Sequence, residues 1–464
     1  MVFNVCKPSS SVKKIVEKYN VPGPRYTSYP TVPFWKHNPL KIEDWIKSIS
    51  TNTASFKSND LSLYIHLPYC ESLCTFCGCH KRITKNHAVE GPYIDAVIKE
   101  WELYQKEFKF NPDIRELHFG GGTPTFFEPD QLIRLVTAIF GKSSIDPEHA
   151  ELSFEAHPNN TSKEHLEKLH AFGFRRLSLG IQDYSPTVQQ AINRIQPFED
   201  VKKVHEQAKA IGYKSISHDL VFGLPKQRMN DIIDTVQKTL ELRPDRIALY
   251  SYAHVPWIKG NGQRGYDESD LPQDSVKRAL YEKAKAMLEA EGYLEIGMDH
   301  FALSHDDLSI AFKAKNLHRN FMGYTTQNTN FLLGLGMSAI SDSWFGFAQN
   351  EKSTEEYIKI VNTDTIPVFR GHVLSDLDLE IRKYILDLMC HFETEFDSES
   401  QFKEKHAQII ARLDEMINDG LVVVTGDKVT VTEEGIAFVR NCCMAFDMDL
   451  ADTAQRKNMF SKTI

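Results

Sequence analysis

The chain has 464 residues, of which 41% are hydrophobic and 11% aromatic, and its formal net charge at pH 7 is -9. This composition excludes a disordered chain, and the acidic balance argues against nucleic acid as the main partner, because phosphate binding requires a basic excess. The length suffices for a full-sized barrel or doubly wound sheet with a smaller domain. The sequence contains no apolar run of about 18 residues, so we expect a cytoplasmic protein that does not contact a membrane.

Residues 1–58 are predicted to form an extension that precedes the first strand and covers the active site of the domain that follows. A helix is expected at Ser11–Tyr19. The segment Arg25-Tyr-Thr-Ser-Tyr-Pro-Thr31 contains too much Pro, Thr and Ser for a helix. It is either a plain linker or a binding segment, because Arg and Tyr are the residue types that hold carboxylates and flat rings.

From Leu61 onward, short apolar runs alternate with amphipathic helical stretches, which predicts βα units and a parallel sheet. The six expected strands are Leu61–Leu67, Ile114–Phe119, Glu151–Glu155, Arg176–Gly180, Ser215–Val221 and Arg246–Tyr252. Six such units indicate a partial barrel or an open doubly wound sheet, with the chemistry at the carboxyl ends of the strands. The predicted fold class is therefore α/β, as a partial (β/α)6 TIM-like barrel within residues 59–353.

The region after the barrel is predicted to end in a separate domain. A helix is expected at Asp274–Glu291, and the glycine-rich stretch between Gly297 and Ile340 has either a packing role or a functional one. Residues 354–464 are predicted to form a mainly α-helical C-terminal domain with a winged-helix pattern. Its expected elements are helices at Leu377–Met389 and Glu399–Asn418, a hairpin at Leu421–Val431 and a helix beginning near Thr432.

Polar or glycine-rich residues mark the carboxyl end of each predicted strand. The cysteine-rich loop Cys70–Cys79 follows the first strand and Gly120-Gly-Gly122 the second, Glu155 ends the third, Gln182 follows the fourth, Asp219 lies toward the end of the fifth and Ala253-His254 follows the sixth. Lone carboxylates in apolar strands are costly unless they are paired or bind a ligand. The glycines form either a tight turn or a close backbone approach to a ligand, and they lack the Lys of a phosphate loop. Arg194 is expected in a helix, as a solvated residue or a ligand contact.

Four of the eight cysteines lie within ten positions, in the pattern Cys70-x3-Cys74-x2-Cys77-Gly-Cys79. The other four, Cys6, Cys390, Cys442 and Cys443, give no disulfide framework. Clustered thiolates favour zinc or iron–sulfur, and the spacing differs from the paired knuckles of structural zinc. An iron–sulfur cube needs four ligands, so one iron is open to a substrate or cofactor if Cys79 does not reach it. Structural zinc and buried free thiols are the alternatives.

Together, the cysteine pattern, the glycines with Thr123-Pro-Thr125 and the strand-end residues resemble radical S-adenosylmethionine (SAM) enzymes. The chain more closely resembles the oxygen-independent coproporphyrinogen III oxidases (dehydrogenases), from about Pro24 to Asp447. Three motifs restrict the resemblance from the superfamily to this family. They are Pro24-Arg-Tyr-Thr-Ser-Tyr-Pro-Thr31, Cys77-Gly-Cys79 and Gly323-Tyr-Thr-Thr-Gln327. Met322 stands where the family pattern has Gln, which leaves a contact at that position open.

The resemblance implies a [4Fe–4S] cluster held by Cys70, Cys74 and Cys77, with Cys79 not a ligand and its role unexplained. It also implies two molecules of S-adenosyl-L-methionine. The first molecule would contact Tyr64, Gly121, Glu155 and Ile340. The second would contact Phe76, Gly122, Thr123, Gln182, Arg194, Asp219 and Ala253. We further expect Arg25 to hold a propionate of the substrate.

The activity that the resemblance implies is a step of haem biosynthesis. A 5′-deoxyadenosyl radical removes a hydrogen atom from each of two propionates of coproporphyrinogen III, and loss of CO2 and one electron gives the vinyl groups of protoporphyrinogen IX. The expected electron donor is a reduced flavodoxin or ferredoxin, and the expected oligomeric state is a monomer. A related haem-binding chaperone that transfers haem is the alternative. Such chaperones usually lack the Arg-Tyr-Thr-Ser segment and the fourth cysteine, both of which are present here.

Overall fold

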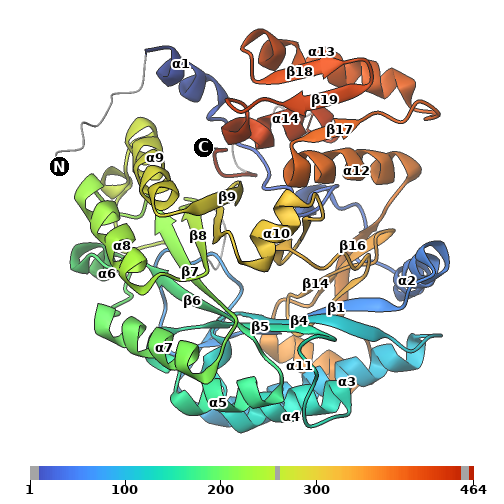
Figure 1. The fold of residues 1–464 in the computed structure, drawn as a ribbon. Helices are drawn as coiled ribbons and strands as arrows, with labels where there is room; N and C mark the ends of the chain where they lie inside the picture. The colour runs from blue at the N-terminus through green and yellow to red at the C-terminus, as the bar shows by residue number, and fades with distance from the viewer. Residues whose placement is uncertain (1–9, 257–261, 451–458, 464) are drawn as a thin grey trace.

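The computed structural model describes residues 10–256, 262–450 and 459–463, and its largest element is a twelve-stranded sheet (Figure 1). The strand order is β16-β15-β14-β13-β1-β4-β5-β6-β7-β8-β10-β9. Six neighbouring strands are mutually parallel: β1 (Asp60–Leu67), β4 (Asp113–Gly121), β5 (Glu151–Ala156), β6 (Arg176–Gln182), β7 (Ser215–Phe222) and β8 (Arg246–Ser251). The predicted α/β partial (β/α)6 barrel is therefore confirmed, and all six expected strands are present.

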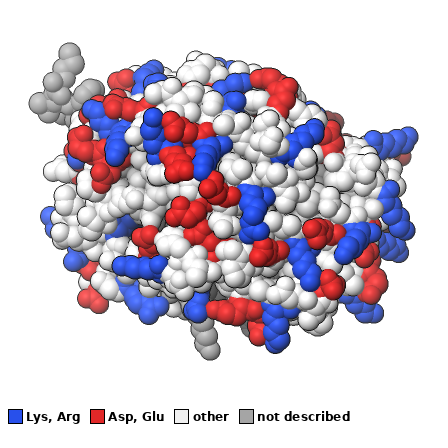
Figure 2. Space-filling view, turned by 90° about the horizontal axis from the view of Figure 1, so that it is seen from below, with Lys and Arg blue, Asp and Glu red and all other residues white. Residues whose placement is uncertain are grey.

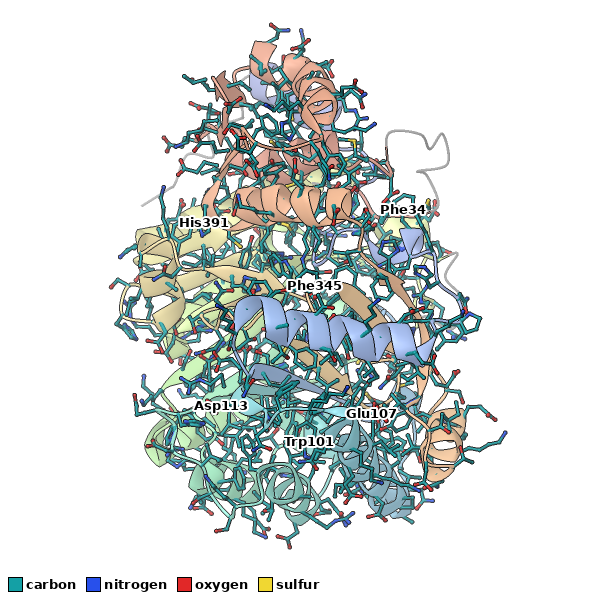
Figure 3. The ribbon with its side chains drawn as sticks, turned by 90° about the vertical axis from the view of Figure 1, so that its right-hand side faces the viewer. Phe34, Trp101, Glu107, Asp113, Phe345 and His391 are labelled. Atoms are coloured by element: carbon teal, nitrogen blue, oxygen red, sulfur yellow. The ribbon has the colours of Figure 1, made fainter. Side chains whose placement is uncertain are left out.

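Helices cover the outer side of this curved sheet (Figure 1). They are α3 (Glu90–Glu107), α4 (Pro129–Phe140), α5 (Lys163–Phe172), α6 (Pro186–Ala191), α7 (Phe198–Ile211), α8 (Met229–Leu242) and α9 (Asp274–Ala290). The main core lies between the two layers. Leu61, Leu63, Ile65 and Leu67 of β1 are fully buried. Alternate side chains of a strand point to the same face, and these four face the helices. Trp101 of α3, labelled in Figure 3, packs in the same core.

The region after α9, which contains the glycine-rich stretch and extends to residue 373, forms strands that the sequence pattern does not predict. On the β1 side these are β13 (Leu332–Leu335), β14 (Ile340–Asp342), β15 (Gly346–Asn350) and β16 (Val368–Val373). On the β8 side they are β9 (Tyr293–Gly297) and β10 (His300–Leu303), and β11 (His318–Asn320) pairs with β12 (Gly323–Thr325). A Cβ at Gly334 would lie 2.5 Å from the carbonyl oxygen of Ile340, so a packing role is confirmed for this glycine.

The N-terminal extension contains two helices, not one. The expected α1 (Ser10–Tyr19) is joined by α2 (Ile42–Phe56), which crosses the face shown in Figure 3. Trp45 of α2 is fully buried and donates from Nε1 to the hydroxyl of Tyr104, 3.2 Å away. The Ser and Thr residues in the second half of α2 hide its helical pattern, because these residues favour caps and turns. The sequence pattern therefore does not predict α2.

The C-terminal elements pack around a second hydrophobic core, at the opposite end of the molecule from α4 (Figure 1). They are α12 (Asp376–His391), β17 (Glu393–Glu395), α13 (Lys403–Asn418), β18 (Val422–Thr425), β19 (Lys428–Val431), η6 (Ile436–Phe438) and α14 (Val439–Phe446). The helix expected near Thr432 was placed too early. Thr432 instead starts a turn in which its hydroxyl donates to the carbonyl of Gly420, and a Cβ at Gly435 would collide with the carbonyl of Leu421. The helix that was expected from Glu399 begins at Lys403.

The remaining elements are short. They are β2 (Tyr69–Cys70), β3 (Arg82–Ile83), α10 (Asp307–Lys313), α11 (Thr354–Asn362) and the 3-10 turns η1 (Val32–Phe34), η2 (His87–Val89), η3 (Pro124–Phe126), η4 (Pro158–Asn160) and η5 (Glu268–Asp270). Charges of both signs are interspersed on the face shown in Figure 2. Among the described residues, no helix combines the length and the apolar character needed to cross a bilayer. Cys6 lies outside the described residues, and Cys390, Cys442 and Cys443 are buried free thiols.

Candidate active site

The carboxyl ends of the parallel strands face a cavity of about 890 Å³. Thirteen of the residues expected at the site line this cavity, although they come from distant parts of the chain. They are Arg25, Cys70, Cys74, Phe76, Cys77, Gly121, Gly122, Thr123, Glu155, Gln182, Arg194, Asp219 and Ala253. The rule that chemistry gathers at the carboxyl ends of parallel strands thus places the cavity correctly.

Tyr64 and Ile340 do not line the cavity. Tyr64 is paired with Gly334 across the β1–β13 ladder, and Gly334 lies against the backbone of Ile340, so the two residues share one edge of the barrel. The Tyr64 hydroxyl is hydrogen-bonded to Nδ1 of His66 at 3.0 Å. A Cβ on Gly120 would lie 2.9 Å from the Tyr64 ring and 3.1 Å from Oε1 of Glu155, so Tyr64 is separated from Glu155 only by this glycine.

The cysteine loop is fixed by its neighbours along the cavity rim. Thr75 donates its amide to the carbonyl of Ile192 at 2.9 Å, and the side-chain amide of Asn193 donates to the carbonyl of Leu73 at 2.8 Å. The amide of Gly262 donates to the carbonyl of Cys77 at 3.2 Å. The loop therefore depends on the segment after α6 and on the segment after β8 for its shape.

Two polar side chains point at the cysteine sulfurs. The Thr123 hydroxyl donates to Sγ of Cys70 at 3.3 Å, and Nη1 of Arg194 donates to Sγ of Cys74 at 3.7 Å. Burial raises the pKa of Cys70 to about 11, and a hydrogen bond from Cys79 lowers the pKa of Cys77 to about 6. All four loop cysteines are free, and Cys79 is the exposed one. Donors aimed at sulfur are the contacts that orient and tune thiolate ligands.

This donor set suits an iron–sulfur cluster. In the described part of the chain, no three His, Cys, Asp or Glu side chains converge as ligands of a single metal ion. The loop instead presents three partly buried thiols to a large cavity, beside a glycine-lined wall. Thiolates are the ligands of iron–sulfur clusters, and three of them leave one iron without a protein ligand.

The glycines at the end of β4 and directly after it pack tightly against the loop that follows β1. A Cβ at Gly122 would lie 2.5 Å from the carbonyl oxygen of Pro68, and Gly121 has a φ of +117°, so neither position accepts a larger residue without strain. The Gly121 amide donates to Oε2 of Glu155 at 3.3 Å. These residues also line the cavity. The two roles predicted for these glycines, a tight turn and a close backbone approach to a ligand, are therefore compatible.

Arg194 lies in a loop and not in the expected helix. Helix α6 ends at Ala191, and Asn193 adopts a left-handed conformation with a φ of 51°, which breaks the helix before Arg194. Nη2 of Arg194 donates to the carbonyl of Gly180 at 2.5 Å, whereas its Nε is buried and has no partner within the described structure. A buried donor without a partner is costly, and a bound acceptor would remove this cost.

Two acidic side chains, Glu155 and Asp219, line the cavity. Burial raises the pKa of Asp219 on β7 to about 6, and Oε1 of Glu155 lies 3.5 Å from Nε2 of His118. Gln182 ends β6 with a φ of 70°, at an irregularity in its pairing with β7. Left-handed non-glycine residues of this kind are uncommon and are often found at functional sites.

Arg25 reaches the cavity from the N-terminal extension. Its Nη2 donates to the carbonyl of Ser251 at 3.0 Å, and its Nη1 contacts Oδ2 of Asp299 at 3.3 Å. Charge interactions with His300 and Arg25 hold the pKa of Asp299 at about 2, against the effect of burial. Met322 lies in the β11–β12 turn, where its amide donates to Oδ1 of Asn320, and does not line the cavity.

Several lining residues were missed by the sequence analysis. They are Lys81 and Lys85 beside the cysteine loop, His157, Asn159 and Asn160 after β5, and Tyr250, Ser251 and Tyr252 at the end of β8. His157, Asn159 and Asn160 follow one predicted strand and Tyr250–Tyr252 end another, so the strand-end rule, extended by a few residues on either side, finds these six. Asp299, which pairs with Arg25 but does not line this cavity, has only a weak sequence signal, as a carboxylate beside His300 in the glycine-rich region.

Comparisons with known proteins agree with this site. The radical SAM superfamily model matches residues 64–239. The oxygen-independent coproporphyrinogen III oxidase of Salmonella typhimurium is 37% identical over 455 residues, which cover 97% of this chain and 98% of the relative. The protein of the same name from Synechocystis is 36% identical over 463 residues, 97% of each chain. The solved structure of coproporphyrinogen III oxidase from Escherichia coli, described as a radical SAM enzyme, has a TM-score of 0.86 and 35% identity and covers 92% of this chain and 98% of its own. The chain belongs to the oxygen-independent coproporphyrinogen III oxidase family of the radical SAM superfamily.

Proposed function

We propose that this protein converts coproporphyrinogen III into protoporphyrinogen IX without oxygen, by oxidative decarboxylation of two propionate side chains. One observation supports this most directly: the three spaced cysteines, the strand-end polar residues and Arg25 line a single cavity of about 890 Å³. A cavity of this size is at the upper end of the range for cofactor and ligand sites. Membership of the family along almost the whole chain supports the same substrate.

The residues suit two kinds of cofactor. We propose that Cys70, Cys74 and Cys77 hold a [4Fe–4S] cluster, and that the iron without a protein ligand binds one S-adenosyl-L-methionine beside Gly121 and Glu155. Tyr64, beside Gly120 and Glu155, and Ile340, against the Gly334 that pairs with Tyr64, are assigned to this same molecule although neither lines the cavity. A second S-adenosyl-L-methionine is assigned to Phe76, Gly122, Thr123, Gln182, Arg194, Asp219 and Ala253. The unpartnered Nε of Arg194 supports this, because a carboxylate would satisfy it.

The bound cluster and S-adenosyl-L-methionine supply a radical able to remove a hydrogen atom from a propionate β-carbon. The protein contributes binding, orientation and exclusion of water and oxygen. The positively charged guanidinium of Arg25 lies at the cavity wall. There it can hold a propionate of the tetra-anionic substrate by paired hydrogen bonds. Each decarboxylation also releases CO2 and one electron, which needs an external acceptor. A reduced flavodoxin or ferredoxin as electron donor and a monomeric state complete the proposal.

The decisive experiment is an anaerobic assay of the purified protein with coproporphyrinogen III, S-adenosyl-L-methionine and a strong reductant. We expect a divinyl product and methionine, with two molecules of CO2 released per porphyrinogen. Cys74→Ser should abolish both products because it removes a cluster ligand. A haem chaperone would instead bind haem stoichiometrically and give no decarboxylation. A protein with structural zinc would be colourless even when it is prepared without oxygen.

The number of bound S-adenosyl-L-methionine molecules is testable separately. Equilibrium dialysis of the reconstituted, unreduced protein should give two molecules per chain. Arg194→Ala should reduce this to one, because it removes the donor assigned to the second carboxylate. Arg134→Ala, at an exposed ion pair with Asp95 on the outer helices, is the matched control and should still bind two. One molecule per chain in the wild type would contradict the second site.

A further inference from the structure

The segment that carries Arg25 is held between the chain's last residues and the C-terminal helices. Pro22 forms an antiparallel bridge with Lys462. The Gly23 amide donates to the carbonyl of Ser461 at 3.0 Å, and the Thr463 amide donates to the carbonyl of Val21 at 2.8 Å. A Cβ at Gly23 would lie 2.7 Å from the sulfur of Met444, so a larger residue here would displace the Met444 side chain of α14.

Arg440 of α14 is the centre of this attachment. Its side chain is buried, with the residue 7% exposed. Its Nε donates to the carbonyl of Pro24 at 2.8 Å, and its Nη2 donates to the carbonyl of Gly23 at 2.5 Å. Its Nη1 donates to the carbonyls of Thr463 at 3.0 Å and Lys462 at 3.4 Å. The planar guanidinium thus joins the N-terminal segment to the last residues at four carbonyl oxygens, a geometry that Lys cannot reproduce.

A second attachment lies on the other side of Arg25. The Tyr26 hydroxyl donates to Oδ2 of Asp447 at 3.1 Å, and the Met448 amide donates to the hydroxyl of Tyr29 at 3.3 Å. Both tyrosines are buried in the core of the C-terminal elements. Arg25 itself reaches away from this core to the carbonyl of Ser251, which lines the cavity, and to the carboxylate of Asp299 beside it. The two attachments therefore flank the one side chain that the segment contributes to the cavity wall.

We propose that Arg440 and Asp447 are positioning residues, which fix the backbone on both sides of Arg25 and so set the place of its guanidinium in the substrate site. This assigns a role in catalysis to the C-terminal elements, which lie outside the barrel. The inference rests on the proposed function only for the role of Arg25 toward a propionate. The attachment itself is independent of that function.

The test combines hydrogen exchange with steady-state kinetics in the full-length holoenzyme. In Arg440→Met, and to a smaller extent in Arg440→Lys, amide exchange in residues 22–31 should rise about tenfold or more, which corresponds to the loss of a charge-assisted hydrogen bond. Exchange in β1 and β4 should not change. Tyr26→Phe removes only a hydroxyl and should give a smaller rise. Lys383→Met, an exposed residue of α12 paired with Asp387, is the matched control and should behave as the wild type.

The kinetic measurement separates positioning from general stability. Arg440→Met should raise the KM for coproporphyrinogen about tenfold, while the rate of S-adenosyl-L-methionine cleavage without substrate stays at the wild-type value. If Arg440 acts through Arg25, the double variant Arg25→Ala/Arg440→Met should have the same KM as Arg25→Ala alone. Additive effects, unchanged exchange in residues 22–31, or faster exchange with an unchanged KM would each overturn the proposal. A wild-type protein without turnover would contradict the proposed function instead, and the exchange data alone would then decide whether Arg440 holds the segment.

Discussion

Among single residues, Asp219 shows how the cavity changes the chemistry of a side chain. It lies on β7, in a wall that also contains Glu155, and burial raises its pKa from 3.8 to about 6. The folded protein therefore retains a proton that the unfolded chain loses as the pH rises from about 4 to about 6. The free energy of unfolding should fall over this range, by at most about 3 kcal/mol, and by less where the cavity admits water.

Asp219→Asn should remove this dependence. Its free energy of unfolding, measured by urea denaturation at several pH values between 4 and 7, should fall less than that of the wild type. Asp414→Asn, an exposed change on α13, should reproduce the wild-type profile. S-adenosyl-L-methionine binding should weaken in the wild type as the pH falls through about 6, since a protonated carboxyl is a poorer acceptor. Identical pH profiles for Asp219→Asn and the wild type would refute the assignment of this proton.

Cys79 differs from the other cysteines of its loop. It is exposed and does not receive the hydrogen bonds that Thr123 and Arg194 give to Cys70 and Cys74. Cys79→Ser should therefore retain about four irons per chain and the brown colour of the cluster after anaerobic reconstitution, whereas Cys70→Ser should lose both. Iron analysis and visible absorbance measure this directly. Loss of the cluster in Cys79→Ser would return Cys79 to the set of ligands.

At the scale of elements, α3 holds the turn between β13 and β14 in place. Glu100 of α3 is fully buried and accepts hydrogen bonds from the amide of Gly336 at 2.8 Å, the side-chain amide of Asn350 at 2.6 Å and the hydroxyl of Tyr357 at 2.6 Å. The hydroxyl of Tyr93, also on α3, accepts from the Met337 amide and donates to the carbonyl of His66. An outer helix is thereby connected to the base of the cysteine loop.

Glu100→Gln should destabilise the protein by about 1–3 kcal/mol, because an amide group would face a donor that the carboxylate now satisfies. Urea denaturation at pH 7.5 measures the change. Glu102→Gln, two residues further along on the exposed face of the same helix, should shift the free energy of unfolding by less than about 0.5 kcal/mol. Equal effects of the two changes would mean that the buried hydrogen bonds of Glu100 do not contribute.

Elements of the barrel could be predicted from the sequence because each is defined by its own residues. Strands such as Asp60–Leu67 contain short, mostly apolar runs between polar or helical stretches, and their ends identify the cavity. The short strands after α9 are defined by distant partners instead: Leu332–Leu335 forms a strand because it pairs with β1, some 270 residues earlier. Local periodicity contains no such information. The same limit applies to Tyr64 and Ile340, whose distance from the cavity depends on that pairing.

For the molecule as a whole, the division into domains is a proposal that the packing helps to refine. The sequence suggested a boundary between residues 353 and 354. However, Tyr357 and Val361 of α11 pack in the core of the barrel, and β16 pairs with β15 at the edge of the main sheet. Among residues after the barrel, the first buried member of the second core is Ile381 of α12, and this core also includes Tyr26 and Tyr29 of the N-terminal extension. We therefore propose that the C-terminal domain begins near residue 375 and includes part of the extension.

Native-state hydrogen exchange in increasing denaturant tests this division, because cooperative units exchange at distinct free energies of opening. Amides of α11 and β16 should become exposed together with those of β1 and β4, since they share the barrel core. Amides of α12, α13 and α14 should form a second unit, joined by those of residues 22–31. The control is Glu100→Gln, which should lower the opening free energy of the first unit, including α11 through the lost Tyr357 bond, and leave the second unit unchanged. If residues 354–373 open with α12, the boundary belongs at residue 353 and the extended barrel sheet is not a folding unit.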